Sequence, residues 1–180
     1  MGLVTELEKK VIEHIEGDYE IEDIETIPRQ EEVQFGNRAK KINLCAYCID
    51  LRKSTDLLFS HNKTTCGKIH KAFLAVASKT VLYYGGDIRS FNGDGLLAFW
   101  SGNKVGISNA VNAALTTKWF LDIRLSDIFE KYEKIDFGIG IDWSEAYIFR
   151  AGIMRDPQNN DLVFIGKCVN FATAIANQAH

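Results

Sequence analysis

The feature that most constrains the fold is an apolar, β-prone run, KINLCAYCIDL, which directly follows Lys40. Its near-continuous hydrophobicity predicts a strand at the centre of a sheet rather than at an edge. A second β-prone region, DIRSFNGDGLLAFW, is interrupted by Asn92-Gly93, a dipeptide that suits the positive φ angles of a tight type I′ turn. This pattern predicts a hairpin that can pair with the central strand.

Helical patterns and further strands fill the rest of the chain. The segment STDLLF offers Ser54 or Thr55 as an N-cap, and KIHKAFLAVASKTVLYY has apolar side chains at three- and four-residue steps. Another helix is predicted from Lys104 to about Tyr132. KIDFGIGIDW and EAYIFRAG predict two strands, and LVFIG leads into a last helix, CVNFATAIANQAH. We therefore expect an α+β fold with helices packed on a mostly antiparallel sheet.

The chain divides by composition near residue 40. Leu3, Leu7, Val11 and Ile15 recur every four residues, which predicts an amphipathic helix. Residues 1–35 carry eleven acidic and three basic side chains, whereas the rest of the chain has a net charge of +5. We expect residues 1–39 to form a helix and an acidic lead-in, either a solvated arm or a packing element, and 40–180 to form the main domain.

Several classes of protein are excluded at this stage. The whole chain has a net charge of only −3, which does not favour a nucleic-acid binder. It shows neither a signal-peptide pattern nor a long apolar segment, so we expect a cytoplasmic protein with no membrane partner. Cys45 and Cys48 form a C-x-x-C pair, but on a strand they point to opposite faces and cannot share a metal ion.

Two aspartates adjoin the predicted central strand and hairpin. Asp50 follows INLCAYCI, and Asp94 follows the Asn92-Gly93 turn. If the hairpin pairs with the strand, both carboxylates can reach one point and hold Mg²⁺ or Mn²⁺ against phosphate oxygens. The alternative is structural, with Asp50 capping the next helix and Asp94 completing the turn. The following DLRKST loop has Arg52, Ser54 and Thr55 at a helix start and favours phosphate binding.

Four motifs in this sequence resemble those of the class III nucleotidyl cyclases. They are Asp50-Leu51-Arg52-Lys53-Ser54-Thr55, Asn92-Gly93-Asp94-Gly95, Phe137-Gly138-Ile139-Gly140 and Ile165-Gly166-Lys167-Cys168-Val169-Asn170. In the family these correspond to the D-I-x-x-F-T element, the G-D hairpin, the G-I-H strand and the W-G-x-x-V-N element. The four occur in the family's order and together cover about residues 40–180.

The resemblance implies a ferredoxin-like βαββαβ core that forms a head-to-tail homodimer with active sites at the interface. It implies that Asp50, Asp94 and the Leu51 carbonyl bind two divalent ions, and that Thr55 contacts phosphate. Asn170 would act in the partner's active site, on the ribose or the transition state. The implied reaction is attack of the ribose 3′-hydroxyl on the α-phosphorus with release of pyrophosphate.

The sequence departs from the family pattern at three positions. Ala174 replaces the Arg that stabilises the transition state, so that either another cation, Lys167 or Arg89, takes over or the domain is a weak catalyst. Ser90 and Val163 stand where purine cyclases carry the Lys and Asp that read adenine. A purine substrate is therefore disfavoured.

Segments FGNRAKK, IDLRKST and RSFNGDGLLAF are most similar to the pyrimidine cyclases of bacterial Pycsar antiphage systems. This similarity implies a UTP or CTP substrate, with UTP favoured, and signalling through cUMP or cCMP to a separate effector. Ser90, Val163, Cys48 and Tyr47 are candidates for reading the base, although a core role is the alternative for Cys48 and Tyr47. Family members usually continue into further C-terminal strands, which we expect to be missing here.

Three alternative functions remain open on the sequence. One is a nucleotide-binding regulatory domain that has lost catalysis, suggested by Ala174. Another is a purine cyclase of the same family. A diguanylate cyclase, suggested by Gly85-Gly86-Asp87, is disfavoured because its signature belongs on the hairpin turn, which here is Asn92-Gly93-Asp94.

Overall fold

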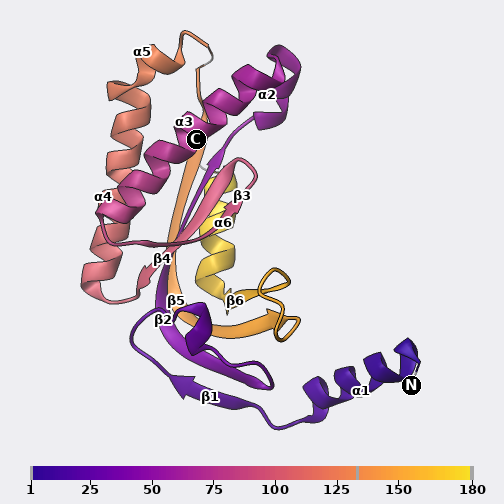
Figure 1. Ribbon diagram of the computed structural model, residues 1–180. Helices are drawn as coiled ribbons and strands as arrows, with labels where there is room; N and C mark the ends of the chain where they lie inside the picture. Colours follow the sequence, from indigo (N-terminus) through magenta and orange to yellow (C-terminus); the bar gives the residue numbers. More distant parts are fainter. Residues whose placement is uncertain (1, 133, 179–180) are drawn as a thin grey trace. The chain divides into compact units, whose positions relative to one another are not determined.

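The structure is a computed structural model that describes residues 2–132 and 134–178 (Figure 1). The chain forms two compact units. The smaller unit combines the residues up to Ile42 with Ala146–Ile165, and the larger unit combines Asn43–Glu145 with the residues from Gly166 onward. The proposed boundary at residues 39 and 40 is a prediction about sequence organisation and stays one.

The strands form a sheet in the order β3-β4-β2-β5-β6, and β1 pairs with β2 outside this order. The bounds are β1 (Glu20–Asp23), β2 (Arg38–Leu51), β3 (Asp87–Asn92), β4 (Gly95–Ser101), β5 (Phe137–Gly152) and β6 (Asn160–Gly166). The predicted central strand is β2, which pairs antiparallel with β4, the second strand of the predicted hairpin. The α+β fold class is confirmed.

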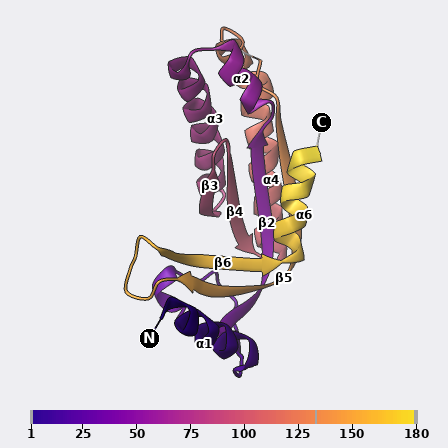
Figure 2. The ribbon, with the colours of Figure 1, turned by 90° about the vertical axis from the view of Figure 1, so that its right-hand side faces the viewer.

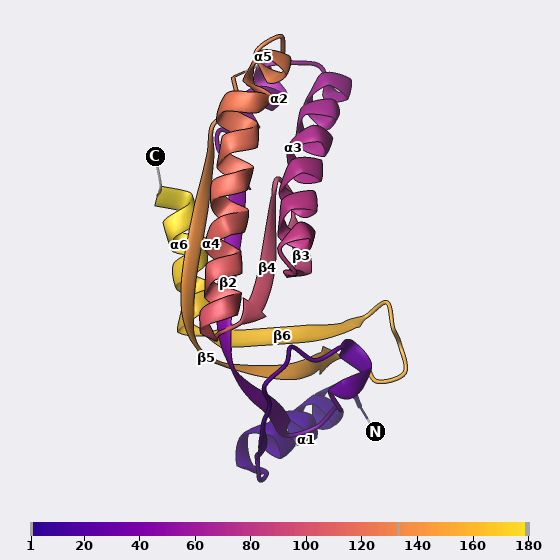
Figure 3. The same ribbon diagram turned by 90° about the vertical axis from the view of Figure 1, so that its left-hand side faces the viewer.

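Six α-helices accompany these strands in the described residues. They are α1 (Leu3–Glu16), α2 (Ser54–Ser60), α3 (Lys63–Tyr83), α4 (Lys104–Trp119), α5 (Ser126–Phe129) and α6 (Lys167–Gln178). Figure 3 shows α3 and α4 side by side, and Figure 2 shows α6 running alongside β2 and β5. No helix in this part of the chain is long and apolar enough to cross a bilayer.

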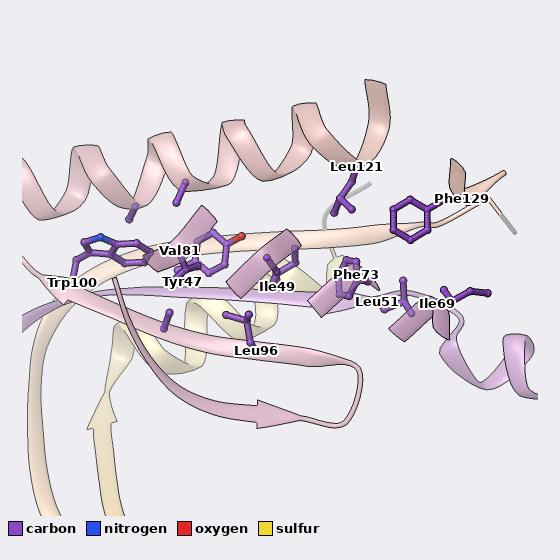
Figure 4. Packing of buried hydrophobic residues seen from close by; sticks show 14 of the residues in the cluster. Tyr47, Ile49, Leu51, Ile69, Phe73, Val81, Leu96, Trp100, Leu121 and Phe129 are labelled. Carbon is purple, nitrogen blue, oxygen red and sulfur yellow. The ribbon is translucent and has the colours of Figure 1, made fainter. Parts of the chain in front are cut away.

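The core of the larger unit depends on the alternation of side chains along β2. Tyr47, Ile49 and Leu51 point to one face, where they form a buried cluster with residues of α3 and α4 such as Phe73 and Ala113 (Figure 4). Tyr47 and Ile49 have no exposed surface. The intervening residues Cys48 and Asp50 point to the other face of β2.

Two predicted elements differ from the structure. The helix expected to reach Tyr132 ends as α4 at Trp119, because a π-helical turn follows and the Leu125 amide donates to the Phe120 carbonyl. The two strands expected on either side of Ser144 are one continuous strand, β5. The segment DWSEA contains no Gly or Pro, so nothing in it breaks the extended backbone.

The smaller unit begins with the predicted amphipathic helix, and the side chains of its apolar stripe are exposed. Leu3, Leu7, Val11 and Ile15 are 51–78% exposed. Strand β1, which lies in the predicted lead-in, was not expected. It pairs in parallel with β2, and ion pairs link the two strands: Arg38–Glu20, Lys40–Glu22 and Lys41–Asp23.

Helix α6 packs against β5 at backbone distance. Its buried side chains are small, namely Cys168, Ala172 and Ala176. A Cβ atom on Gly140 of β5 would lie 1.9 Å from the Ala172 carbonyl oxygen, which is too close for any side chain. Glycine at this position is therefore required for α6 to sit on the strand.

We expect Gly140→Ala to destabilise the protein by about 1–3 kcal/mol, because α6 must move away from β5. The free energy of unfolding in urea measures this change. The control is Gly67→Ala on α3, where an added Cβ has no neighbour within 4 Å and gains up to about 1 kcal/mol of helix propensity. Equal effects of the two substitutions would contradict the packing argument.

Candidate active site

Two aspartates meet at one end of the larger unit because β2 and β4 are paired in a fixed register. Asp50 lies opposite Gly95, and Asp94 occupies the turn just before β4. The Leu51 amide donates to the Asp94 carbonyl at 3.3 Å. A Cβ on Gly95 would lie 2.7 Å from Asp50 Oδ1, so glycine leaves room for the carboxylate. The structure brings together the two residues that sequence analysis paired.

The carboxyl group of Asp50 binds its proton more tightly than usual. Burial and the neighbouring Asp94 raise the pKa of Asp50 from 3.8 to about 6, and Arg52 offsets part of this effect. Two acids that share a half-buried site are stabilised by a cation, and carboxylate oxygens suit Mg²⁺ or Mn²⁺. The donor set therefore fits a hard divalent ion.

The metal ligands available here are few. Among the described residues, no group of three or more His, Cys, Asp or Glu side chains comes together. An ion held by Asp50 and Asp94 must therefore complete its shell with other oxygens. The Leu51 carbonyl, water and the phosphates of a bound nucleotide are the sources that such a site offers.

A cavity of about 480 Å³ opens next to the aspartates. Its size suits a small polar molecule. The residues that line it are Asp50, Leu51, Arg52, Lys53, Ser54, Thr55, Asp94, Asp136 and Asn177. All the residues predicted to bind metal or phosphate therefore lie around one space.

The start of α2 differs from the predicted cap. Lys53, not Ser54 or Thr55, is the N-cap residue, and its backbone is left-handed with φ 53°. The hydroxyl residues are consequently the first two residues of the helix. Both residues line the cavity.

Arg52 is held by α6. Its Nη1 donates to the Asn177 carbonyl at 2.9 Å and its Nη2 donates to the Ala176 carbonyl at 2.7 Å. The Arg52 amide also donates to the Asp136 carbonyl at 2.7 Å. These contacts tie the loop after Asp50 to the C-terminal turn of α6, a role that the sequence did not indicate. Direct phosphate binding by Arg52 stays a prediction.

The two candidates on β2 for reading the base lie on opposite faces of the strand. Tyr47 is fully buried in the core, in keeping with the structural alternative. Cys48 shares its face with Asp50, and burial raises the pKa of its thiol while the Thr173 hydroxyl lowers it. Of these two residues, Cys48 is therefore the one that lies beside α6, on the same face of the sheet as Asp50.

The remaining predicted residues lie elsewhere. Ser90 is half-buried on β3 opposite Leu97, and Val163 is half-buried on β6 in the smaller unit. Asn170 is exposed on α6, and within the described chain it is not among the residues that line the cavity. Its predicted role in a partner's site requires such an exposed position.

Sequence analysis missed Asp136 and Asn177, which also line the cavity. A signal for each was present. Asp136 directly precedes an apolar strand, as Asp94 does, and Asn177 lies seven residues after Asn170 on the same helical face.

Comparisons with solved structures identify the fold. A class III adenylyl cyclase-like ATP-binding protein from Pseudomonas aeruginosa matches with a TM-score of 0.74 and 16% identity, covering 98% of this chain and 40% of that one. The adenylyl cyclase CyaB from P. aeruginosa matches with a TM-score of 0.70 and 20% identity, covering 79% of this chain and 74% of that one. The fold is that of the class III nucleotidyl cyclases.

Comparison with proteins of similar sequence shows the family to which this chain belongs. The uridylate cyclase of Burkholderia cepacia is 32% identical over 185 aligned positions, which cover 99% of this chain and 79% of the relative. Four other curated uridylate cyclases are 24–27% identical. No protein-family model matches. The chain belongs to the nucleotide cyclase family that includes these uridylate cyclases, and it is a nucleotide cyclase.

The raised pKa of Asp50 predicts a pH dependence of stability in the absence of metal. Between pH 4 and 6 the folded protein binds more protons than the unfolded chain, so folding stability falls as the pH rises through this range. Asp50→Asn removes this loss. We expect the variant to be about 1 kcal/mol more stable than the native protein at pH 7, after allowance for solvent screening.

Urea unfolding of both proteins at several pH values, with a chelator present, measures this difference. The control is Asp127→Asn, since Asp127 is exposed on α5. Parallel stability curves for Asp50→Asn and the native protein would show that Asp50 has no unusual proton affinity.

Proposed function

We propose that this cyclase converts a pyrimidine nucleoside triphosphate, UTP in preference to CTP, to its 3′,5′-cyclic monophosphate and pyrophosphate. The observation that carries the proposal is the convergence of Asp50 and Asp94 beside one cavity, in a relative of curated uridylate cyclases. Two divalent ions, Mg²⁺ or Mn²⁺, are the proposed cofactors. When bound, they supply positive charge to the nucleophile and to the leaving phosphates.

The protein's part in the reaction begins with Asp50, Asp94 and the Leu51 carbonyl, which provide oxygen ligands. Ser54 and Thr55 line the same cavity and are placed to bind the triphosphate. The ribose 3′-hydroxyl then attacks the α-phosphorus. A new P–O bond forms, the bond from the α-phosphorus to the leaving pyrophosphate breaks, and the hydroxyl proton leaves to solvent.

Asn170 does not line the cavity of its own chain in the part of the chain that the structure describes. We propose that Asn170 serves the active site of a second chain in a head-to-tail homodimer. Ala174 lies one helical turn beyond Asn170 and provides no charge, whereas Lys167 lies one turn before it and is exposed. Arg89 is engaged by Asp87 at 2.8 Å. Lys167 is therefore the proposed replacement for the missing arginine.

The proposed preference for a pyrimidine base follows from the residues that replace the purine-reading Lys and Asp. Ser90 and Val163 cannot reproduce the hydrogen bonds of a Lys and an Asp, so a bound adenine would leave its polar edge unpaired. Cys48, on the face of β2 shared with Asp50, is a further candidate. The proposed ligand is a nucleotide with the smaller pyrimidine base, and UTP is preferred to CTP.

The wider role that we propose is synthesis of a second messenger in antiphage defence. The cyclic nucleotide would act on a separate effector protein in the cytoplasm, with no nucleic acid or membrane as direct partner. Family membership and the absence of purine-reading groups support this role.

A second candidate function is nucleotide binding without catalysis. The observation that favours it is Ala174, because losing a charge that contacts the transition state costs on the order of 10²- to 10³-fold in rate. Such a protein would bind UTP with metal and form no product.

The proposed reaction is tested by incubating the protein with ATP, GTP, CTP and UTP separately in the presence of Mn²⁺, with cyclic products identified by mass spectrometry. We expect cUMP as the main product. Asp50→Ala and Asp94→Ala should each lower its formation by at least about 10³-fold, because each removes a metal ligand.

Asp127→Ala, which removes an exposed carboxylate on α5, is the matched control and should be fully active. A purine product would overturn the proposed base preference. Full activity of either metal-ligand variant would overturn the site, and UTP binding with no product would favour the second candidate.

The role of Lys167 is tested by Lys167→Ala, for which we expect kcat to fall on the order of 10²-fold with little change in KM. Ala174→Arg in the same chain should restore activity, because it returns a cation to the same face of α6. Lys104→Ala, at the exposed start of α4, is the control. Unchanged kcat in Lys167→Ala would assign the charge to another residue.

A further inference from the structure

Arg52 joins two parts of the larger unit that are far apart in sequence. It follows Asp50 and Leu51 at the end of β2, and its guanidinium donates to the carbonyls of Ala176 and Asn177, 2.7 and 2.9 Å away. These carbonyls belong to the last turn of α6 within the described residues, a place where helix carbonyls commonly accept from side chains. A cation there also complements the negative end of the helix dipole.

The route from Arg52 to α6 crosses β5 at a glycine. A Cβ on Gly138 would lie 2.7 Å from Arg52 Nη2 and 1.8 Å from the Ala176 carbonyl oxygen. Only glycine leaves space for both the guanidinium and the helix at this point. The contact is therefore built into two elements besides the Arg52 loop.

Helix α6 is held at both ends, so the position of one end constrains the position of the other. The Cys168 amide at its start donates to Ser144 Oγ at 3.0 Å, and Arg52 holds its last turn. Between these ends, Ala172 packs directly on Gly140. A rigid helix with small buried side chains transmits a displacement at one end to the other.

One exposed face of α6 carries both Asn177 and Asn170. Asn177 lines the cavity beside the chain's own Asp50, whereas Asn170 lies two turns earlier, about 10 Å along the helix axis. In the proposed dimer, Asn170 acts in the other chain's active site. The helix that Arg52 holds thus connects the two sites.

We infer that Arg52 is a positioning residue that couples the two active sites of the dimer: through α6 it sets the position of Asn170 in the partner's site. This inference rests on the proposed function, because it requires Asn170 to act between chains. It adds that the loop following the metal ligands in one site controls the geometry of the other.

The test uses a dimer with a single working site. One chain carries Asp50→Ala and the other carries Asn170→Ala, so that the only complete site combines Asp50 of the second chain with Asn170 of the first. Arg52→Lys is then placed in the Asp50→Ala chain, whose own metal site is already inactive. Lysine keeps the charge but cannot form the two-pronged contact with both carbonyls.

We expect this change to lower kcat for cUMP formation by about tenfold or more, because a small misplacement of a positioned group has effects of this size. The KM for UTP should stay within about twofold, since the triphosphate contacts of the working chain are intact. The control is Arg124→Lys in the same chain, an exposed arginine on the π-helical turn.

The measured kcat values distinguish coupling between the sites from a local role of Arg52. A fall in kcat from Arg52→Lys in the Asp50→Ala chain supports the coupling, provided that the melting temperature stays near that of the control. An unchanged kcat overturns it and leaves Arg52 with a local role. If the parent pair is no more active than either homodimer, the placement of Asn170 between chains is wrong, and the inference falls with it.

Discussion

The register between β2 and β4 is the constraint on which the candidate site depends. It places Asp50 opposite Gly95, so that Asp94, one residue earlier in the turn, comes to the same end of the sheet. A shift by one residue would turn Asp50 toward the core and separate the two acids. The buried side chains of β2 prevent such a shift, because Tyr47, Ile49 and Leu51 would lose their places in the cluster. Core packing therefore fixes the positions of the two carboxylates in the candidate site.

Function and stability oppose each other at this site. Burial and the neighbouring Asp94 raise the pKa of Asp50, so that its ionisation weakens the metal-free fold at neutral pH, and the same surroundings favour a bound cation. Replacing Asp50 with a neutral residue would remove this cost together with a proposed metal ligand. The protein carries this local instability at its proposed metal site.

The sequence predicted the central strand, the hairpin and the pairing of Asp50 with Asp94, because periodicity and turn chemistry are local signals that carry these features. It did not predict the π-helical turn at Leu125, which depends on a single shift in hydrogen bonding, nor the continuity of β5 through Ser144. The contact of Arg52 with α6 was also beyond reach, since its acceptors are backbone carbonyls more than 120 residues away. Long-range contacts to backbone atoms leave no residue-type signature in a single sequence.

The exposed stripe of α1 has a consequence for the protein's behaviour in solution. Apolar side chains that are half to three-quarters exposed favour adhesion between molecules, whereas the acidic residues of the same N-terminal region make the molecules repel. Repulsion of this kind acts over a screening length of about 8 Å at physiological ionic strength and shrinks as salt is added. Added salt is therefore expected to favour association through the α1 stripe, because it screens the charge repulsion and leaves the apolar contact unchanged.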